Sequence, residues 1–265
     1  MRVIANGIEM NYAITGKEGA PVIVLSHSLG SGIVMWDPQI EKFASEFRVL
    51  RYDTRGHGQS EAPNGPYDLG VLVDDAVSLI DVLGIDRAHW VGLSMGGMIG
   101  QGIALRCPER LSTLALCDTM AVVPIEAQDV WLDRIDTARD SGVGALADTT
   151  MERWFTASFL NAQPQAVEPI RQQFLATPDS GYIGCCEAIR RLNYLSQLNN
   201  IQVPTLVVVG EQDPATPVSA ADAIHAQIAN SQRVVIPDAA HLSNIEQCDL
   251  FNEIIIQFLR RHAVM

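Results

Sequence analysis

Ser94 is the residue of this 265-residue chain whose surroundings first indicate chemistry. It is the centre of the segment GLSMG (92–96), which matches the G-x-S-x-G pattern of a nucleophile elbow. The strand-like segment HWVG leads into it and the helical pattern MIGQGIALRC follows, which is the context that such an elbow requires. A tight strand-to-helix turn brings backbone segments close together, so only small residues fit beside the serine. The pattern predicts a nucleophile, and a structural glycine-rich turn is the alternative.

A serine hydroxyl becomes a useful nucleophile only beside a general base that an acid orients. In chains with this elbow the order is serine, then aspartate or glutamate, then histidine. Asp213 follows the apolar segment TLVVVG, and His241 lies in the loop after the last strand-like segment, QRVVIPD. Glu211 and Asp238 are alternative acids, although the loop position favours Asp213. The sequence therefore predicts a triad of Ser94, Asp213 and His241.

The remaining histidines are expected to have other roles. His57 lies in the turn DTRGHGQS, where a structural role is expected, and His89 begins a strand. His225 and His262 fall in helical patterns that predict solvated side chains. His241 is left as the predicted base.

An attacked carbonyl develops an oxyanion, which backbone N–H groups can stabilise. We expect one donor to be the amide of Met95, which follows the nucleophile at a helix N-terminus. The second is assigned to the amide of Leu29 in the loop SHSLGSG, while His27 and Ser28 shape that loop.

The elements that must position these residues alternate between short β-branched segments and longer helical patterns. Strands are predicted at 22–26, 47–53, 88–94, 111–118, 205–210 and 232–238. The segment 67–85 has helical spacing of its apolar residues and stops near Gly84. Asn6-Gly7 stands between two alternating segments and predicts an antiparallel hairpin at the sheet edge. The fold class is therefore α/β, with a mostly parallel sheet and helices on both faces.

Residues 121–197 break this rhythm, because no strand-like segment occurs there and several helical patterns do. We predict a helical cap, defined as residues 121–197, inserted in a core made of residues 1–120 and 198–265. The core carries the predicted triad, and the cap is expected to cover it.

Composition limits the partners. The formal net charge of −13 disfavours nucleic acid and anionic membranes. The N-terminal residues lack the apolar segment of a signal peptide, so a cytoplasmic location is expected. The five cysteines form no C-x-x-C pair and are expected to be reduced and mostly buried. No metal or organic cofactor is indicated, because no ligand spacing such as HExxH occurs.

The chain resembles the α/β-hydrolase superfamily and, within it, the 3-oxoadipate enol-lactonase family. GLSMGG and RYDTRGHG are shared with cofactor-free peroxidases and esterases, whereas ERWFT and GYIGCCEAIR in the cap resemble the lactonases specifically. The family's triad falls on the same three residues, and His27-Ser28 replaces the common His-Gly pair of the first oxyanion loop. The resemblance implies hydrolysis of 3-oxoadipate enol-lactone to 3-oxoadipate through an acyl-enzyme, in bacterial aromatic catabolism by the β-ketoadipate pathway.

The substrate implied by this resemblance is a small anionic lactone, so a cation is expected at the pocket. Among the arginines of the cap we favour Arg134, near Trp131, and Trp154 is either a pocket wall or part of the core. A general carboxylesterase or a cofactor-free perhydrolase could use the same triad, and a non-enzymatic ligand receptor is a further alternative. Dehalogenases and epoxide hydrolases are disfavoured, because their nucleophile is an aspartate. The sequence carries no signal of an oligomeric state.

Overall fold

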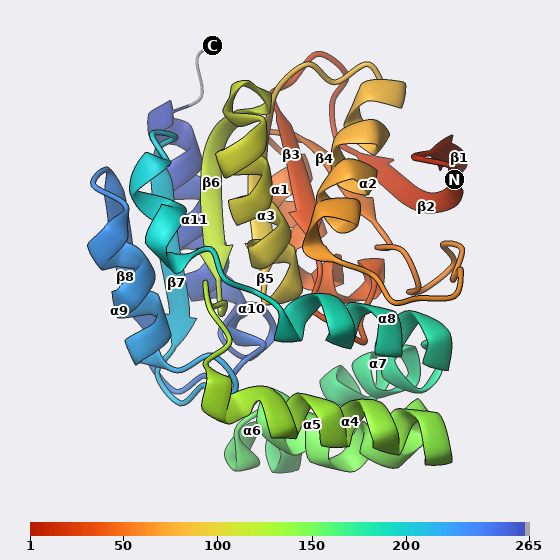
Figure 1. Cartoon of the computed structure of the whole chain (residues 1–265). Helices are drawn as coiled ribbons and strands as arrows, with labels where there is room; N and C mark the ends of the chain where they lie inside the picture. The colour runs from red at the N-terminus through yellow and green to blue at the C-terminus, as the bar shows by residue number, and fades with distance from the viewer. Residues whose placement is uncertain (263–265) are drawn as a thin grey trace.

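Eight strands form one sheet in the computed structural model, which describes residues 1–262 (Figure 1). The spatial order is β1-β2-β4-β3-β5-β6-β7-β8. The pairs β1–β2 and β2–β4 are antiparallel, and the remaining pairs are parallel. The strands are β1 (Arg2–Ala5), β2 (Ile8–Thr15), β3 (Val22–Ser26), β4 (Arg48–Tyr52), β5 (Ala88–Leu93), β6 (Leu111–Cys117), β7 (Thr205–Gly210) and β8 (Ser231–Ile236). This order confirms the predicted α/β fold, and the ends of the predicted strands differ from the observed ones by at most two residues.

The predicted hairpin joins β1 and β2. Asn6 and Gly7 lie between the two strands with φ of 47° and 76°. A two-residue turn that matches the twist of the strands needs positive φ at both central residues, which asparagine and glycine tolerate best. The residue types at these two positions therefore explain why the chain turns back here to pair β1 with β2.

Helices cover both faces of the sheet. α1 (Asp37–Ala44) packs against α11 (Cys248–His262) on one face, while α2 (Leu69–Val82) packs against α3 (Met95–Arg106) on the other (Figure 1). Because both faces are covered, every residue of β5 and of β7 is buried. The helix α9 (Val218–Gln227) packs on β7 and β8.

The limits of α2 follow from its end residues. Asp68 accepts a hydrogen bond from the Val71 amide at 2.8 Å and so caps the first turn. Gly84, beyond the last turn, has φ of 67°, a conformation that glycine adopts without strain. The helix predicted within 67–85 is confirmed with shorter ends.

The cap, residues 121–197, lies between β6 and β7 in the chain and over the sheet end toward which the parallel strands point (Figure 1). A single antiparallel bridge joins Val122 and Asn193, near the two ends of this segment. Its helices are α4 (Gln128–Ser141), α5 (Ala147–Trp154), α6 (Ala157–Ala162), α7 (Pro164–Leu175) and α8 (Asp179–Arg190). The helices and the bridge support residues 121–197 as the limits of the cap, and we propose this division.

Glycines hold α8 against the core. A Cβ placed on Gly181 would lie 2.0 Å from the Gly56 carbonyl oxygen, so the two backbones meet without a side chain between them.

All five cysteines are free thiols, of which Cys107 and Cys248 are partly exposed. No helix within residues 1–262 combines the length and the apolar character needed to cross a bilayer.

Candidate active site

Ser94 occupies a sharp turn between β5 and α3, with φ of 55° and ψ of −115°. A non-glycine residue at positive φ is strained, so the surroundings must hold it there. A Cβ on Gly96 would lie 2.0 Å from the Ser26 carbonyl oxygen, and one on Gly92 would lie 2.1 Å from the Gly96 carbonyl oxygen. The glycines on both sides of Ser94 are therefore required by close backbone contacts, and the turn has the geometry of the predicted elbow.

Hydrogen bonds to the neighbouring strand hold the Ser94 backbone. Its amide donates to the Cys117 carbonyl oxygen at 2.9 Å, and the Thr119 hydroxyl donates to the Ser94 carbonyl oxygen at 2.7 Å. With its backbone anchored to the end of β6, Ser94 contributes its side chain to the wall of a cavity.

His241 and Asp213 form a buried pair behind this serine. The His241 Nδ1 lies 2.9 Å from the Asp213 Oδ2, and both side chains are almost fully excluded from solvent. Asp213 Oδ1 also accepts the amides of Ala215 at 2.7 Å and Thr216 at 3.0 Å. The Thr216 hydroxyl donates to the Asp213 Oδ2 at 2.5 Å. Hydrogen bonds from its own loop thus fix the Asp213 carboxylate in the position that orients the imidazole.

The two alternative acids do not occupy this position. Glu211 and Asp238 are exposed, and the carboxylate that contacts His241 belongs to Asp213. Burial raises the pKa of the Asp213 carboxyl, but the charge and hydrogen bond of His241 and the hydrogen bonds of Thr216 outweigh it and leave the pKa lowered. Asp213 is therefore an anion beside the imidazole at neutral pH.

A second buried carboxyl, Asp118, lies close to this pair at the end of β6. Burial raises its pKa well above the ordinary value, and the negative charge of Asp213 raises it further. Its Oδ1 accepts the Gly210 amide at 2.7 Å and its Oδ2 accepts the Ser243 hydroxyl at 2.6 Å. Asp118 thus bridges the strand before Asp213 and the helix after His241.

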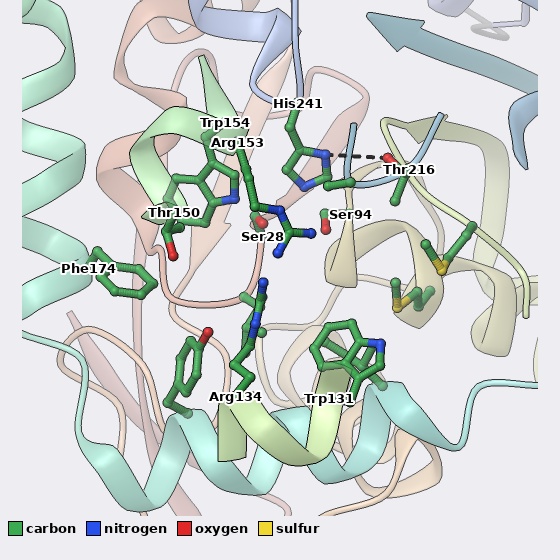
Figure 2. Close-up of a pocket in the computed structure, with 16 residues that line it drawn as sticks. Ser28, Ser94, Trp131, Arg134, Thr150, Arg153, Trp154, Phe174, Thr216 and His241 are labelled. Atoms are coloured by element: carbon green, nitrogen blue, oxygen red, sulfur yellow. Dashed lines mark hydrogen bonds between the residues drawn. The ribbon is translucent and has the colours of Figure 1, made fainter. Parts of the chain in front are cut away.

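Ser94 and His241 line the same cavity. Figure 2 shows the Ser94 hydroxyl below the imidazole ring. Within residues 1–262, the hydrogen bonds recorded for the His241 ring go from Nδ1 to Asp213 and Thr216, and none joins Nε2 to Ser94. The free Nε2 therefore faces a cavity that also holds a serine hydroxyl.

The loop after β3 brings the Leu29 amide to this cavity. Gly30 donates its amide to the His57 Nε2 at 2.8 Å, and Gly96 donates its amide to the His27 carbonyl oxygen at 3.1 Å. The backbone amides of Leu29 and Met95, in contrast, donate no hydrogen bond to any residue in 1–262. The two amides predicted to bind an oxyanion are thus left available, while their neighbours are engaged.

His57 has the structural role that its turn predicts. Burial, with the nearby His27 as a smaller contribution, lowers the pKa of His57 to about 3. The ring is therefore neutral at physiological pH, and its Nδ1 lies 3.1 Å from the Arg55 carbonyl oxygen. A proton on Nδ1 leaves the Nε2 lone pair free to accept the Gly30 amide.

Two arginines of the cap line the cavity opposite the core. Arg134 comes from α4 and Arg153 from α5, and Figure 2 shows both guanidinium groups pointing into the cavity. Arg134 lies over the Trp131 ring at 5.2 Å. Neither arginine has a carboxylate partner among the ion pairs of residues 1–262. Two unpaired cations therefore face the same space in a strongly acidic protein.

Trp154 belongs to the pocket wall and to the core at the same time. It lines the cavity but is only 6% exposed, and its ring meets Phe174 edge to face at 5.7 Å. The sequence had left these two interpretations open.

Arg153 was one of the cap arginines considered for the pocket, of which only Arg134 was favoured, and Thr216 was not predicted as a site residue. Arg153 directly precedes Trp154 in the distinctive segment ERWFT, and this adjacency was an available signal. Thr216 stands three residues after Asp213, a spacing at which the amide and the hydroxyl of a threonine can donate hydrogen bonds to the aspartate side chain in a turn.

A family model for the alpha/beta hydrolase fold matches residues 21–247, which span the elbow, the cap and the His241 loop. The chain belongs to the α/β-hydrolase family, and the protein is an esterase-type hydrolase. The receptor alternative is therefore set aside.

Within that family the chain is similar to enol-lactonases over almost its whole length. It is 37% identical to 3-oxoadipate enol-lactonase 2 of Acinetobacter baylyi, over 97% of this chain and 95% of that protein. It is 34% identical to 3-oxoadipate enol-lactonase 1 of the same bacterium, over 96% and 94%. The enol-lactonase of Burkholderia xenovorans LB400, a crystal structure, has a TM-score of 0.95 at 42% identity and covers 98% of this chain and 100% of its own. The resemblance found in the sequence is confirmed.

Proposed function

We propose that the protein hydrolyses 3-oxoadipate enol-lactone to 3-oxoadipate, with Ser94 as the nucleophile, His241 as the general base and Asp213 as the acid that orients it. The observation that carries this proposal is the cavity in which Ser94 and the Asp213–His241 pair face two unpaired arginines. The similarity to enol-lactonases supports the choice of an enol-lactone.

The chemistry proceeds through an acyl-enzyme. His241 Nε2 takes the Ser94 proton as Oγ attacks the lactone carbonyl carbon, and a tetrahedral oxyanion forms. The bond between that carbon and the ring oxygen then breaks, and His241 returns the proton to the departing enol oxygen. The enol oxygen is a better leaving group than an alkoxide because its negative charge is delocalised, and the released enol then tautomerises to a ketone. Water, activated by His241, attacks the ester carbon, releases the carboxylate and restores Ser94.

The charge distribution supports these roles. An anionic Asp213 stabilises the imidazolium that forms when His241 accepts the serine proton. The hydrogen bond between Asp213 and the His241 Nδ1 keeps Nε2 as the basic nitrogen.

The Leu29 and Met95 amides are the proposed donors to the oxyanion. Each lacks an acceptor among the described residues, and Met95 is the first residue of α3, where the helix dipole favours negative charge. A single donor of this kind contributes on the order of 100-fold or more to kcat in enzymes where it has been removed.

The arginines supply the selectivity for an anionic lactone. Arg134 is the proposed partner of the substrate carboxylate, because its guanidinium points into the cavity and is braced by Trp131. Trp154 forms the apolar wall beside the ring of the substrate. Arg153 lines the same cavity and adds a second positive charge. The predicted cytoplasmic location and the place in aromatic catabolism stay predictions.

Hydrolysis of the enol-lactone, followed by the loss of its ultraviolet absorbance, tests the proposal directly. Wild type should cleave the lactone with a kcat/KM far above that for p-nitrophenyl acetate, and Ser94→Ala should abolish both activities while the far-ultraviolet circular dichroism stays unchanged. A wild type that prefers the neutral aryl ester would refute the lactonase proposal in favour of a general carboxylesterase.

Arg134→Ala tests the carboxylate partner. Loss of a charged hydrogen bond worth ~1.5–3 kcal/mol should raise KM for the anionic lactone by roughly ten- to a hundredfold, with KM for p-nitrophenyl acetate nearly unchanged. Arg139→Ala is the matched control, since Arg139 lies on the same helix but is exposed and paired with Asp136. Equal effects of Arg134→Ala on both substrates would contradict the assignment.

A further inference from the structure

We propose that Glu246 is a positioning residue that fixes the His241 loop and the cap segment Trp154–Thr156 relative to each other. One buried carboxylate thereby sets the place of the proposed base and of the pocket wall. The inference rests on the proposed roles of Ser94 and His241, but not on the identity of the lactone.

The first part of the link lies next to the histidine. Glu246 is the last residue of α10 (Ser243–Glu246), and its side chain is almost fully buried. Its Oε2 accepts the amide of Ala240, the residue before His241, at 2.5 Å. The carboxylate therefore holds the backbone on the N-terminal side of the base.

The second part of the link lies in the cap. The Glu246 Oε1 accepts the Thr156 amide at 2.8 Å and the Thr156 hydroxyl at 2.7 Å. The same threonine caps α6, because its oxygen accepts the Phe159 amide at 3.2 Å. Glu246 thus binds the junction between α5 and α6.

A backbone hydrogen bond completes the connection on the other side of the base. The Leu242 amide donates to the Trp154 carbonyl oxygen at 3.0 Å. Both residues adjacent to His241 are therefore held by contacts that lead to the segment 154–156. Arg153 and Trp154, which line the cavity, belong to or directly adjoin this segment.

A carboxylate is the group this position requires. It accepts three hydrogen bonds from Ala240 and Thr156, and a carboxylate is an acceptor at both oxygens. A glutamine would direct an NH2 group at one of these donors, so even a side chain of nearly the same size breaks the hydrogen bonds on one side of the link. Displacing a catalytic group by about 1 Å can lower a rate by roughly a hundredfold.

The test combines two substitutions with kinetics on two substrates. Glu246→Gln should lower kcat for p-nitrophenyl acetate by about tenfold or more and also raise KM for the enol-lactone severalfold. Thr156→Val, which removes the hydroxyl on the cap side alone, should raise KM for the lactone with a smaller change in kcat. Thr156→Ser keeps the hydroxyl and should restore wild-type KM.

Controls separate positioning from a general loss of stability. Glu253→Gln, on the exposed part of α11, should leave all constants as in wild type. In the double variant of Glu246→Gln and Thr156→Val, the rise in KM should be smaller than the product of the two single effects, because both break one link.

A Glu246→Gln variant with wild-type kcat and KM, or one whose only change is a lower melting temperature, would overturn the inference. If Glu246→Gln does not fold, equal KM values for Thr156→Val and Thr156→Ser would do so. The neutral ester reports on Ser94 and His241 whichever lactone is the substrate, so a wild type inactive on the enol-lactone would refute the proposed substrate alone.

Discussion

Replacing His57 by glutamine should remove one part of the sensitivity of this fold to acid. The His57 ring is fully buried, and its Nε2 accepts the amide of Gly30 in the loop that carries Leu29. Protonation of the ring would fill that lone pair and direct an N–H at the Gly30 N–H. A glutamine side chain offers an oxygen in a similar place but has no proton to gain.

The magnitude follows from the pKa. Burial lowers the pKa of His57 from 6.5 to about 3 in the folded protein, whereas the unfolded chain regains the ordinary value. The unfolded state therefore binds a proton first as the pH falls, and the stability present above 6.5 is lost on the way down to about 3. At ~1.4 kcal/mol per pKa unit, the contribution decreases by about 3 kcal/mol between about pH 7 and about pH 4.

Urea unfolding followed by tryptophan fluorescence across this pH range measures the effect. The free energy of unfolding of wild type, minus that of His57→Gln, should fall by about 3 kcal/mol from about pH 7 to about pH 4. The burial of His27 is common to both proteins and cancels in the difference, which leaves only its smaller interaction with His57. Exposed His225 provides the control, since His225→Gln should keep the acid dependence of wild type. A difference between wild type and His57→Gln that is constant with pH would refute the reasoning.

Three further predictions concern buried positions. Asp118→Asn keeps a side-chain acceptor and a donor, and because burial raises the pKa of Asp118 above its ordinary value of 3.8, wild type should lose stability relative to the variant as the pH rises above that value; a stability difference that stays constant between about pH 5 and about pH 8 would contradict this. Gly96→Ala forces a Cβ to within 2.0 Å of a backbone oxygen and should destabilise the protein by ~3 kcal/mol or more, whereas a Cβ on Gly144 meets nothing nearer than 3.6 Å, so Gly144→Ala should melt near wild type. Asp75→Ala leaves the buried guanidinium of Arg55 without the carboxylate that now accepts two hydrogen bonds at 2.6 Å, and a loss of about 3–5 kcal/mol is expected by thermal melts monitored by circular dichroism; an unchanged melting temperature would show that the pair is not stabilising.

Much of the core was predictable because its signals are local. The turn at Asn6-Gly7 depends on the φ angles of two residues, and the buried strands depend on continuous apolar segments such as TLVVVG. Gly96 is required by the Ser26 carbonyl oxygen of the distant strand β3, but Gly84 and Gly92 are required by the conformation of a few neighbouring residues. Such features are present in a short segment before any tertiary contact forms.

The cap was less predictable, because its helices expose residues of similar type to solvent and to the cavity. Arg134 and Arg139 lie on the same helix, yet one points into the cavity and the other is paired with Asp136 at the surface. Arg153 looked like other cap arginines until α5 was packed over the core. Helical spacing alone does not tell which face of a cap helix meets the substrate.

The sequence by itself determined the α/β class, the turn at Ser94 and the order of the proposed acid and base along the chain, because each depends on short segments with strong backbone preferences. Only the tertiary structure decided that Asp213, and not Glu211 or Asp238, contacts His241. It also decided which arginines face the cavity and that Glu246 joins Ala240 to Thr156. These contacts join residues far apart in the chain, and their geometry depends on how the sheet, the loops and the cap pack together.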